Sequence, residues 1–379
     1  MTFWDGAGLP STTGQGPVFN VTSPRALAHA LRAPGQLGLG RAYVSGLLEV
    51  DDLDAAIAVL DTWKPPPIDA AARVRLMLGG LRAGGLVGPP KIPASELRPR
   101  GKRHSIGRDK RAVRHHYDVS NEFFALYLDS SMTYSCAVFS GGAASLEEAQ
   151  EAKLELVCQK LALAPGERVL DVGCGWGSFA IHAASRHDAR VVGITLSEPQ
   201  ATLARQRVAE AGVADRVEIR VTDYRELRED QFDAIASIGM VEHVGGSRID
   251  LYAERLAALL KPGGRLLNHG ISRLRHSDPE AGQFSNRYVF PDGAPLHLSR
   301  VLGALERAGL VTDHVEGFGA DYAETLGHWI RRLDERLDEA VRLASPERVR
   351  VWRLYLRAAR NGFQTGFTSI YQARAHLAA

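Results

Sequence analysis

The stretch that decides the fold is RVLDVGCGWG, at residues 168–177. A short apolar run that ends abruptly in glycines is typical of a buried strand followed by a tight turn. Gly173, Gly175 and Gly177 stand at alternate positions, where glycine permits positive φ angles and lets the backbone approach a ligand closely. Asp171 comes two residues before the first of them. We therefore expect a ligand-binding turn at the carboxyl end of a strand.

The sequence on both sides of this turn alternates between helical and strand patterns. Helical spacing over residues 146–163 precedes the turn, and SFAIHAASRH follows it. Further strand patterns, separated by helical segments, are ARVVGITLS, VEIRVTDY, FDAIASIG and RLLNHGIS. Strands that alternate with helices of this length indicate βαβ units. The predicted fold class is α/β, with a doubly wound, mostly parallel sheet.

The first part of the chain has a different pattern. At 379 residues the chain is long enough for two domains. We predict a small N-terminal α+β domain over residues 1–88, which ends in the Gly/Pro-rich segment GGLVGPPKIP. Helices are expected to start after Ser23-Pro24 and to span residues 70–82. The glycine-punctuated residues 35–52 are expected to form short strands or turns.

Basic residues cluster in a predicted linker over residues 89–116. Such a run is often only a solvated segment, but it also suits anionic phosphate groups on lipid or nucleic acid, and both interpretations stay open. Aromatic residues suited to base stacking are absent from it, which disfavours nucleic acid as a partner. The basic residues are Arg98, Arg100, Lys102, Arg103, Arg108, Lys110, Arg111 and Arg114, opposed only by Asp109.

Composition excludes several classes of protein. The net charge of +2 gives no overall polyanion-binding signal, and no apolar run is long enough for a transmembrane helix. The N-terminus lacks the features of a signal peptide. The chain has three cysteines, Cys136, Cys158 and Cys174. Their odd number and wide spacing argue against a disulfide framework or a zinc cluster. We expect a cytoplasmic protein without a metal site.

The glycine turn favours S-adenosylmethionine as the cofactor. A dinucleotide site would read GxGxxG, whereas GxGxG after an acid suits a cationic ligand without phosphate. Asp171 would orient the amino end of the cofactor, and polar residues after the next two strands would hold the ribose and adenine. The candidate cofactor residues are Tyr134, Ser135, Asp171, Gly173, Gly175, Thr195, Leu196, Gln200, Asp223, Tyr224 and Ile238.

Five segments in a fixed order resemble the cyclopropane-fatty-acid synthase family of lipid methyltransferases. They are HHYDVSNEFFALYLDSSMTYSCAVF, VLDVGCGWGSFA, VVGITLSEPQ, SIGMVEHVG and DYAETLGHW. The resemblance covers essentially residue 113 to the C-terminus, and residues 23–46 look like the small leading domain of the longer, phospholipid-acting members. It implies a Rossmann-like class I methyltransferase fold, with the catalytic domain over residues 117–379.

The resemblance also implies a reaction. Family members transfer a methyl group from S-adenosylmethionine to a cis double bond of an acyl chain, and a bound bicarbonate ion removes a proton from the resulting carbocation to close a cyclopropane ring. Taken singly, the matching residues could be core or packing residues, but their coincidence at family positions favours catalysis. They are Cys136, Glu242, His269 and Tyr322, with the backbone of Ile271 on the bicarbonate and His116 near the active site.

Two positions depart from the family pattern. Val138 and Val241 stand where the family often has aromatic residues, and aromatic faces stabilise a nearby cation by roughly 0.5–2 kcal/mol per contact. We therefore keep an alternative product, a 10-methylene fatty acid, which would call for a flavin or nicotinamide reductase as partner. A second alternative is a non-catalytic protein that binds S-adenosylmethionine or lipid.

The implied substrate determines the expected location. A phospholipid acyl chain lies in the bilayer, so we expect the protein to associate peripherally with the inner face of the membrane. The basic run is placed to engage anionic headgroups, at about 1 kcal/mol per basic residue near the surface. The resemblance further implies a homodimer.

Overall fold

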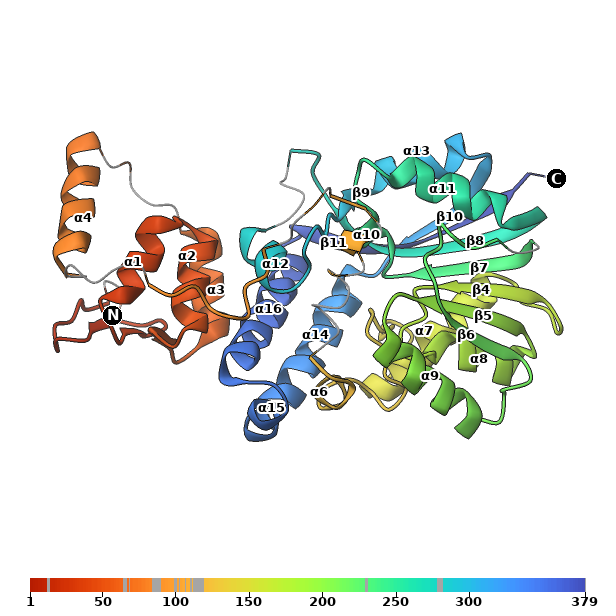
Figure 1. The fold of residues 1–379 in the computed structure, drawn as a ribbon, viewed down its shortest axis with the longest axis horizontal. Helices are drawn as coiled ribbons and strands as arrows, with labels where there is room; N and C mark the ends of the chain where they lie inside the picture. The colour runs from red at the N-terminus through yellow and green to blue at the C-terminus, as the bar shows by residue number, and fades with distance from the viewer. Residues whose placement is uncertain are drawn as a thin grey trace.

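The computed structural model describes residues 1–11, 14–63, 67, 69–83, 90–98, 101, 103–105, 107–109, 111, 119–228, 231–277 and 282–378. A large α/β part contains the glycine turn, and a smaller part formed by the N-terminal residues lies beside it (Figure 1).

The large part is built on one twisted sheet, in the order β10-β11-β8-β7-β4-β5-β6 with β9 beside β8. The pairs formed among β4 to β8 are parallel, whereas β11 runs antiparallel to both β8 and β10. This confirms the predicted α/β class with a mostly parallel sheet. The strands are β4 (Arg168–Val172), β5 (Arg190–Thr195), β6 (Val217–Val221), β7 (Phe232–Ile238), β8 (Leu260–Arg273), β9 (Leu296–His297), β10 (Leu310–Gly317) and β11 (Thr368–Leu377).

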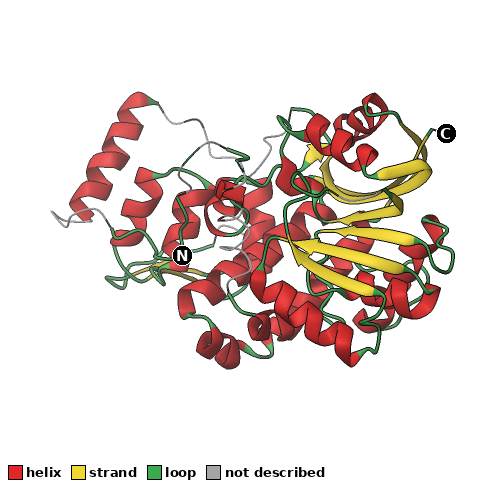
Figure 2. Ribbon diagram, turned by 45° about the vertical axis from the view of Figure 1, so that its right-hand side comes forward, coloured by secondary structure: helices red, strands yellow, loops and turns green. Residues whose placement is uncertain are grey.

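Helices cover both faces of the sheet, as Figures 1 and 2 show. On one face lie α7 (Leu146–Lys160), α8 (Ser178–His187) and α9 (Glu198–Glu210); on the other lie α11 (Ile249–Ala258) and α13 (Leu298–Arg307). Apolar side chains of the strands are buried beneath both groups. The short helix α10 (Val241–Val244) directly follows β7.

A second group of helices lies between the sheet and the N-terminal part. It comprises α6 (Asn121–Ala125), α12 (Gln283–Tyr288), α14 (Gly319–Asp334), α15 (Leu337–Leu343) and α16 (Pro346–Gln364). These helices enclose an aromatic core in which Tyr134 stacks on Trp329, with ring centroids 5.1 Å apart. Phe124 packs against Trp176 of the glycine turn, at 5.1 Å, and thereby joins this core to the sheet edge.

The N-terminal part combines a three-stranded sheet with helices. The strands are β1 (Thr2–Phe3), β2 (Phe19–Val21) and β3 (Leu48–Val50), and the helices are α1 (Arg25–Arg32), α2 (Gln36–Val44), α3 (Leu53–Thr62) and α4 (Ala70–Ala83). The expected helices after Ser23-Pro24 and over residues 70–82 are present as α1 and α4.

The expectation for residues 35–52 was wrong over most of its length, because Gln36–Val44 forms α2 and only Leu48–Val50 is a strand. The glycines that suggested turns instead permit close packing. A Cβ at Gly38 would lie 2.3 Å from the carbonyl oxygen of Ala33, and one at Gly40 would lie 2.3 Å from the ring of Phe284. Tertiary contacts, rather than turn geometry, therefore explain these two glycines.

Ion pairs join the N-terminal part to the helices of the large part. Arg41 of α2 donates to the Glu96 carboxylate over 2.6 and 2.7 Å, and the Tyr288 hydroxyl donates to the same carboxylate. Asp54 of α3 accepts from Arg357 and Arg360 of α16. Within the described residues, no helix is both long and apolar enough to span a bilayer.

Candidate active site

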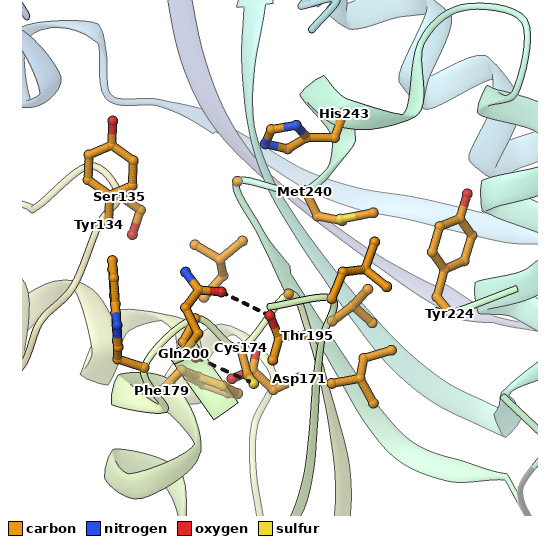
Figure 3. Close-up of a pocket in the computed structure, with 18 of the residues that line it drawn as sticks. Tyr134, Ser135, Asp171, Cys174, Phe179, Thr195, Gln200, Tyr224, Met240 and His243 are labelled. Carbon is orange, nitrogen blue, oxygen red and sulfur yellow. Dashed lines mark hydrogen bonds between the residues drawn. The ribbon is translucent and has the colours of Figure 1, made fainter. Parts of the chain in front are cut away.

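The largest cluster of predicted site residues lies in a cavity at the carboxyl ends of β4, β5 and β7 (Figure 3). This is the edge where ligands bind in sheets of this kind. The cavity also reaches the loop over residues 132–135, which approaches from the side of α7. All the candidate cofactor residues line it: Tyr134, Ser135, Asp171, Gly173, Gly175, Thr195, Leu196, Gln200, Asp223, Tyr224 and Ile238.

Asp171 provides a buried carboxyl group in this cavity. It is 2% exposed, and its Oδ2 has no hydrogen-bond partner among the described residues. Burial raises the pKa of Asp171 to about 7, and the positive charge of Lys153 opposes this rise. An unpartnered buried carboxylate is unfavourable unless a cation neutralises it. The cavity therefore fits a positively charged ligand group.

The glycine turn leaves room for a ligand. Gly173, Gly175 and Gly177 have φ angles of +81°, +54° and +84°, which side-chain-bearing residues adopt rarely. A Cβ at Gly175 would meet no heavy atom of the described residues within 4 Å, so the backbone there is open to close approach. This cradle and the Asp171 carboxyl group together suit the adenosyl and amino ends of S-adenosylmethionine.

Two residues of α7 hold the loop over residues 132–135. The Gln150 amide donates to the carbonyl oxygens of Thr133 and Ser135, over 3.2 and 2.9 Å. The Lys153 ammonium donates to the Ser135 hydroxyl over 2.9 Å, and burial lowers the pKa of Lys153 to about 8. Sequence reasoning missed both residues. A signal for Lys153 was present, because it stands four residues from both Ala149 and Val157. This spacing places the lysine on the apolar, buried face of the helix.

The far end of the cavity carries its own polar pairs. The Thr195 hydroxyl donates to the Gln200 side-chain oxygen over 2.9 Å, so the two predicted ribose-binding residues lie together. The Asp223 carboxylate accepts two hydrogen bonds from the Arg225 side chain, over 2.8 and 2.6 Å. Arg225 also donates to Asp109, which lines the cavity. Part of the predicted basic linker thus lies against the candidate adenine end.

The basic run is partly engaged in internal ion pairs. Arg108 donates to the Asp292 carboxylate over 2.7 Å, and Arg103 donates to the same group over 3.2 Å. These contacts attach the described part of the run to the large domain.

The candidate bicarbonate residues adjoin this cavity without lining it: Ile238, which lines the cavity, is the register partner of His269. Cys136 is fully buried. Its segment is attached to the start of α14: Asp321 Oδ1 accepts from the backbone N–H groups of Phe139 and Ser140, over 2.6 and 2.8 Å. The Cys136 thiol donates to the carbonyl oxygen of Phe318, at 3.7 Å. Burial, followed by the charge of Asp321, raises the pKa of this thiol well above its ordinary value.

Glu242 lies in the first turn of α10. Its Oε1 accepts from the backbone N–H of Ile271 over 2.7 Å, while Oε2 is buried without a partner among the described residues. Burial raises the pKa of Glu242 to about 7, and the hydrogen bond from Ile271 opposes this rise. Two members of the set implied by the resemblance are therefore in direct contact.

His269 and Tyr322 both lie beside Phe318. The His269 and Phe318 rings are stacked, 6.3 Å between centroids and 11° between planes, and Tyr322 stands one helical turn after Phe318. Burial, with the charges of Lys153 and Lys160, lowers the pKa of His269 well below its ordinary value, so the ring is neutral. Both side chains belong to the buried interior. His116 lies outside the described residues.

The two departures from the family pattern are both buried valines with different surroundings. Val138 packs in the aromatic core with Phe318 and Tyr322, whereas Val241 packs in the core beneath α11 and α13. A Cβ at Gly270 would lie 2.4 Å from Val241, so this valine already fills its site against β8.

Comparisons with known proteins agree with this geometry. The family model for mycolic acid cyclopropane synthetase matches residues 104–373. The chain belongs to this family. It is therefore an S-adenosylmethionine-dependent methyltransferase of the cyclopropane synthase type, a class that methylates lipid acyl chains.

Relatives of this cyclopropane synthetase family match almost the whole chain. A probable fatty acid methyltransferase, Rv3720 of Mycobacterium tuberculosis, is 40% identical and covers 96% of this chain and 87% of the relative. The cyclopropane-fatty-acyl-phospholipid synthase of Escherichia coli is 36% identical over 89% of this chain and 82% of its own length. The tuberculostearic acid methyltransferase UfaA1 of Mycobacterium tuberculosis is 32% identical, and the match covers 98% of this chain and 86% of the relative.

Solved structures give the same family. The mycolic acid cyclopropane synthase CmaA1, complexed with SAH and CTAB, superposes with a TM-score of 0.67 at 32% identity, covering 70% of this chain and 98% of that one. The cyclopropane synthase MmaA2 from Mycobacterium tuberculosis gives the same values.

Cofactor binding should weaken as the pH falls through about 7. The Asp171 carboxyl group of the free protein has a pKa of about 7, and a bound cation favours its ionised form. The affinity for S-adenosylmethionine should then fall by up to about tenfold per pH unit below about pH 7. Calorimetry measures this affinity, at pH values below the pKa of Lys153 so that the lysine stays charged throughout. His243, which burial holds at a pKa of about 4, does not titrate in this window.

Two variants serve as comparisons for this titration. Asp171→Asn should bind S-adenosylmethionine more weakly near neutral pH and lose the pH dependence. Asp250→Asn, at an exposed carboxylate of α11, should keep the wild-type profile. Equal wild-type affinity on both sides of pH 7 would show that Asp171 does not carry the interaction.

Proposed function

We propose that this chain methylates the cis double bond of an unsaturated acyl chain in a membrane phospholipid, and that bound bicarbonate deprotonates the resulting carbocation to give a cyclopropane fatty acid. The observation that carries this proposal is that two buried atoms, Glu242 Oε2 and His269 Nε2, have no partner among the described residues. They adjoin a cavity suited to a cation, because Ile238 of its lining is the register partner of His269. Family membership supplies the reaction class.

The cofactor end of the site positions the methyl donor. S-adenosylmethionine supplies an electrophilic methyl group on a positively charged sulfur. The Asp171 carboxylate would balance positive charge of the cofactor, and the glycine turn would let the backbone lie against its adenosyl part. Lys153 keeps Asp171 more readily ionised than burial alone would allow. An alkene is a weak nucleophile, so positioning and exclusion of water must supply much of the acceleration.

The candidate bicarbonate residues suit an oxyanion. An ionised Glu242 would repel bicarbonate, but its pKa of about 7 lets the carboxyl group be protonated near neutrality and donate through Oε2. His269 is neutral, so one of its ring nitrogens carries a proton. The backbone N–H of Ile271 already holds Glu242 in place. These groups would bind the base that accepts the proton of the carbocation.

Cys136 is proposed as a wall of this anion site rather than as a nucleophile. Its raised pKa keeps the thiol protonated, and a thiolate is the nucleophilic form. Methylation of an alkene requires no covalent bond to the enzyme.

The alternative product is a 10-methylene fatty acid, for which the protein would need a partner reductase to reach a methyl branch. The observation that favours it is Val138, a small side chain in the buried apolar cluster that also contains Phe318 and Tyr322. Fewer aromatic contacts would change how the carbocation is held before it loses its proton. The relative named tuberculostearic acid methyltransferase shows that the family is not confined to enzymes named cyclopropane synthases.

Lipid analysis of cells that express the protein tests this proposal. The wild-type chain should convert oleoyl phospholipid to a cyclopropane product, whereas Glu242→Gln should lower conversion by about tenfold to a hundredfold, because an amide is a weaker hydrogen-bond donor to bicarbonate than a protonated carboxyl group. Cyclopropane and methylene products are isomers of equal mass, so proton NMR must distinguish ring protons from vinylidene protons.

A matched control is Glu254→Gln, which makes the same change at an exposed position of α11 and should retain activity. A methylene product without cyclopropane would replace the main proposal by its alternative. Binding of S-adenosylmethionine without any lipid product in the wild type would instead favour the non-catalytic role.

We further propose that the N-terminal part contacts the bilayer. Large apolar side chains are exposed on two of its helices: Val59 and Leu60 near the end of α3, Trp63 directly after it, and Val74 and Leu78 on α4. Exposed apolar side chains beside basic ones are typical of surfaces that insert into the interfacial region of a membrane. Anionic headgroups would attract basic residues of the predicted linker other than Arg103 and Arg108, which pair with Asp292.

Vesicle sedimentation measures this contact. Trp63 is 57% exposed, and Trp63→Glu should weaken binding to phosphatidylglycerol vesicles, with an effect that persists at high salt. Val311→Glu, at a position 48% exposed on the edge strand β10, is the matched control and should bind as the wild type does. Equal loss in both variants would mean that added negative charge alone, and not this surface, governs binding.

A further inference from the structure

A row of polar side chains that includes His269 crosses the antiparallel part of the sheet. Glu316 of β10 is the register partner of Gln372 of β11, and Gln372 is the register partner of His269 of β8. Residues paired in this way project from the same face of a sheet. Lys160, at the end of α7, contacts the row. None of the segments that carry the family resemblance contains Gln372 or Lys160.

Hydrogen bonds connect the row into a chain. The Lys160 ammonium lies 2.5 Å from Glu316 Oε2 and 2.7 Å from Gln372 Oε1. The other end of the Gln372 amide, Nε2, lies 3.1 Å from His269 Nδ1. Gln372 and His269 are both completely buried.

The direction of each hydrogen bond follows from what each group can do. A lysine ammonium only donates, so the group that faces Lys160 must be the oxygen of the Gln372 amide. The amide nitrogen then faces His269 and only donates. His269 Nδ1 must therefore accept, which requires that the ring proton sits on Nε2.

We propose that Lys160 and Gln372 are positioning residues that hold His269 as its Nε2–H tautomer, so that the imidazole presents an N–H donor to an oxyanion. This inference rests on the proposed function for the identity of the anion, bicarbonate, but not for the tautomer. His269 Nε2 is buried and has no partner among the described residues, as a donor reserved for a ligand would be.

Phe318 and two lysines influence the orientation and the charge of the His269 ring. Phe318 is stacked with His269, and the Lys160 ammonium lies 4.9 Å from the centroid of the same Phe318 ring. Burial and the nearby positive charges of Lys153 and Lys160 disfavour the imidazolium form. Glu316 pairs with Lys160 and favours its ammonium form, in which the lysine can only donate to Gln372.

The isosteric substitution Gln372→Glu reverses the polarity of this chain. A glutamate accepts from both neighbours, so His269 would have to donate through Nδ1 and leave Nε2 as an acceptor. Nitrogen-15 NMR of the full chain labelled at histidine reads the tautomer directly, and the His269 signals are assigned by their loss in His269→Gln. We expect Nε2–H in the wild type and Nδ1–H in Gln372→Glu.

Kinetics supply a second readout. Loss of a hydrogen bond to a charged group costs roughly tenfold to a hundredfold in binding, so Gln372→Glu should raise the bicarbonate concentration for half-maximal activity by about that factor. The KM for S-adenosylmethionine should stay unchanged. Gln206→Glu makes the same exchange on the exposed side of α9 and should alter neither quantity.

The outcomes are separable. An Nδ1–H ring in the wild type, or an unchanged tautomer in folded Gln372→Glu, would overturn the inference. A wild-type enzyme whose activity ignores bicarbonate would contradict the proposed function, while the NMR result would still decide whether Gln372 sets the tautomer.

A second inference concerns a cluster of metal-binding side chains between α7 and α8, on different residues from those above. Cys158, His182 and His187 each place one ligand atom within 4.8 Å of the others. The Glu155 carboxylate lies 3.1 Å from His182 Nε2 and 3.0 Å from His187 Nε2. The widely spaced cysteines gave no sign of this site, because both histidines come from another helix.

We infer that this cluster binds a divalent transition metal such as Zn²⁺. Two imidazoles and one thiolate are ligands that suit tetrahedral zinc, and a water molecule would complete the coordination. Binding would release the Cys158 thiol proton to solvent and replace it with a metal–sulfur bond. The metal would clamp α7, which carries Lys153, to α8, which follows the glycine turn.

Cobalt(II) is the probe, because it takes tetrahedral sites and gives a thiolate charge-transfer absorption. The purified full chain should show this band at about one equivalent, Cys158→Ser should lose it, and Cys174→Ser should keep it. Zinc should also raise the melting temperature of the wild type but not of His182→Gln. No band at saturating cobalt, or a band that survives in Cys158→Ser, would overturn this inference.

Discussion

The arrangement of the site depends on one buried charge, the ammonium group of Lys153. Its side chain is almost completely buried, and a charge in such a place is unfavourable unless it is paired and hydrogen-bonded. The Ser135 hydroxyl accepts its hydrogen bond, and the negative charges of Asp129 and Asp171 favour its charged form. One side chain of α7 thus binds the loop over residues 132–135, which directly precedes Cys136, and interacts electrostatically with the carboxylate at the end of β4.

Burial also sets the chemistry at the two ends of the site. Asp171 and Glu242 both have pKa values of about 7, because each carboxyl group is enclosed and has one oxygen without a partner among the described residues. Such shifted groups are concentrated at functional sites, where the same shift in a structural group would only reduce stability. Asp171 suits a cation when ionised, whereas Glu242 suits an anion when protonated.

Much of the fold was predictable because the signals were local. The strand that ends at Gly173 and the alternation after it follow from short-range patterns, and they place the cofactor residues at one edge of the sheet. Prediction failed at α2, where Gly38 and Gly40 looked like turn residues but serve close packing against α1 and Phe284. Lys153 and Gln150 were missed because a polar residue on a helix is normally interpreted as exposed.

The sequence by itself determined the α/β fold, the glycine turn and the family, because these depend on residue types at fixed spacings along the chain. Only the tertiary structure decided which polar atoms lack partners within the described residues and which way their hydrogen bonds run. Gln372 and His269 are about a hundred residues apart, and nothing local relates them. They meet because β11 pairs antiparallel with β8, and burial there leaves each donor and acceptor few alternatives.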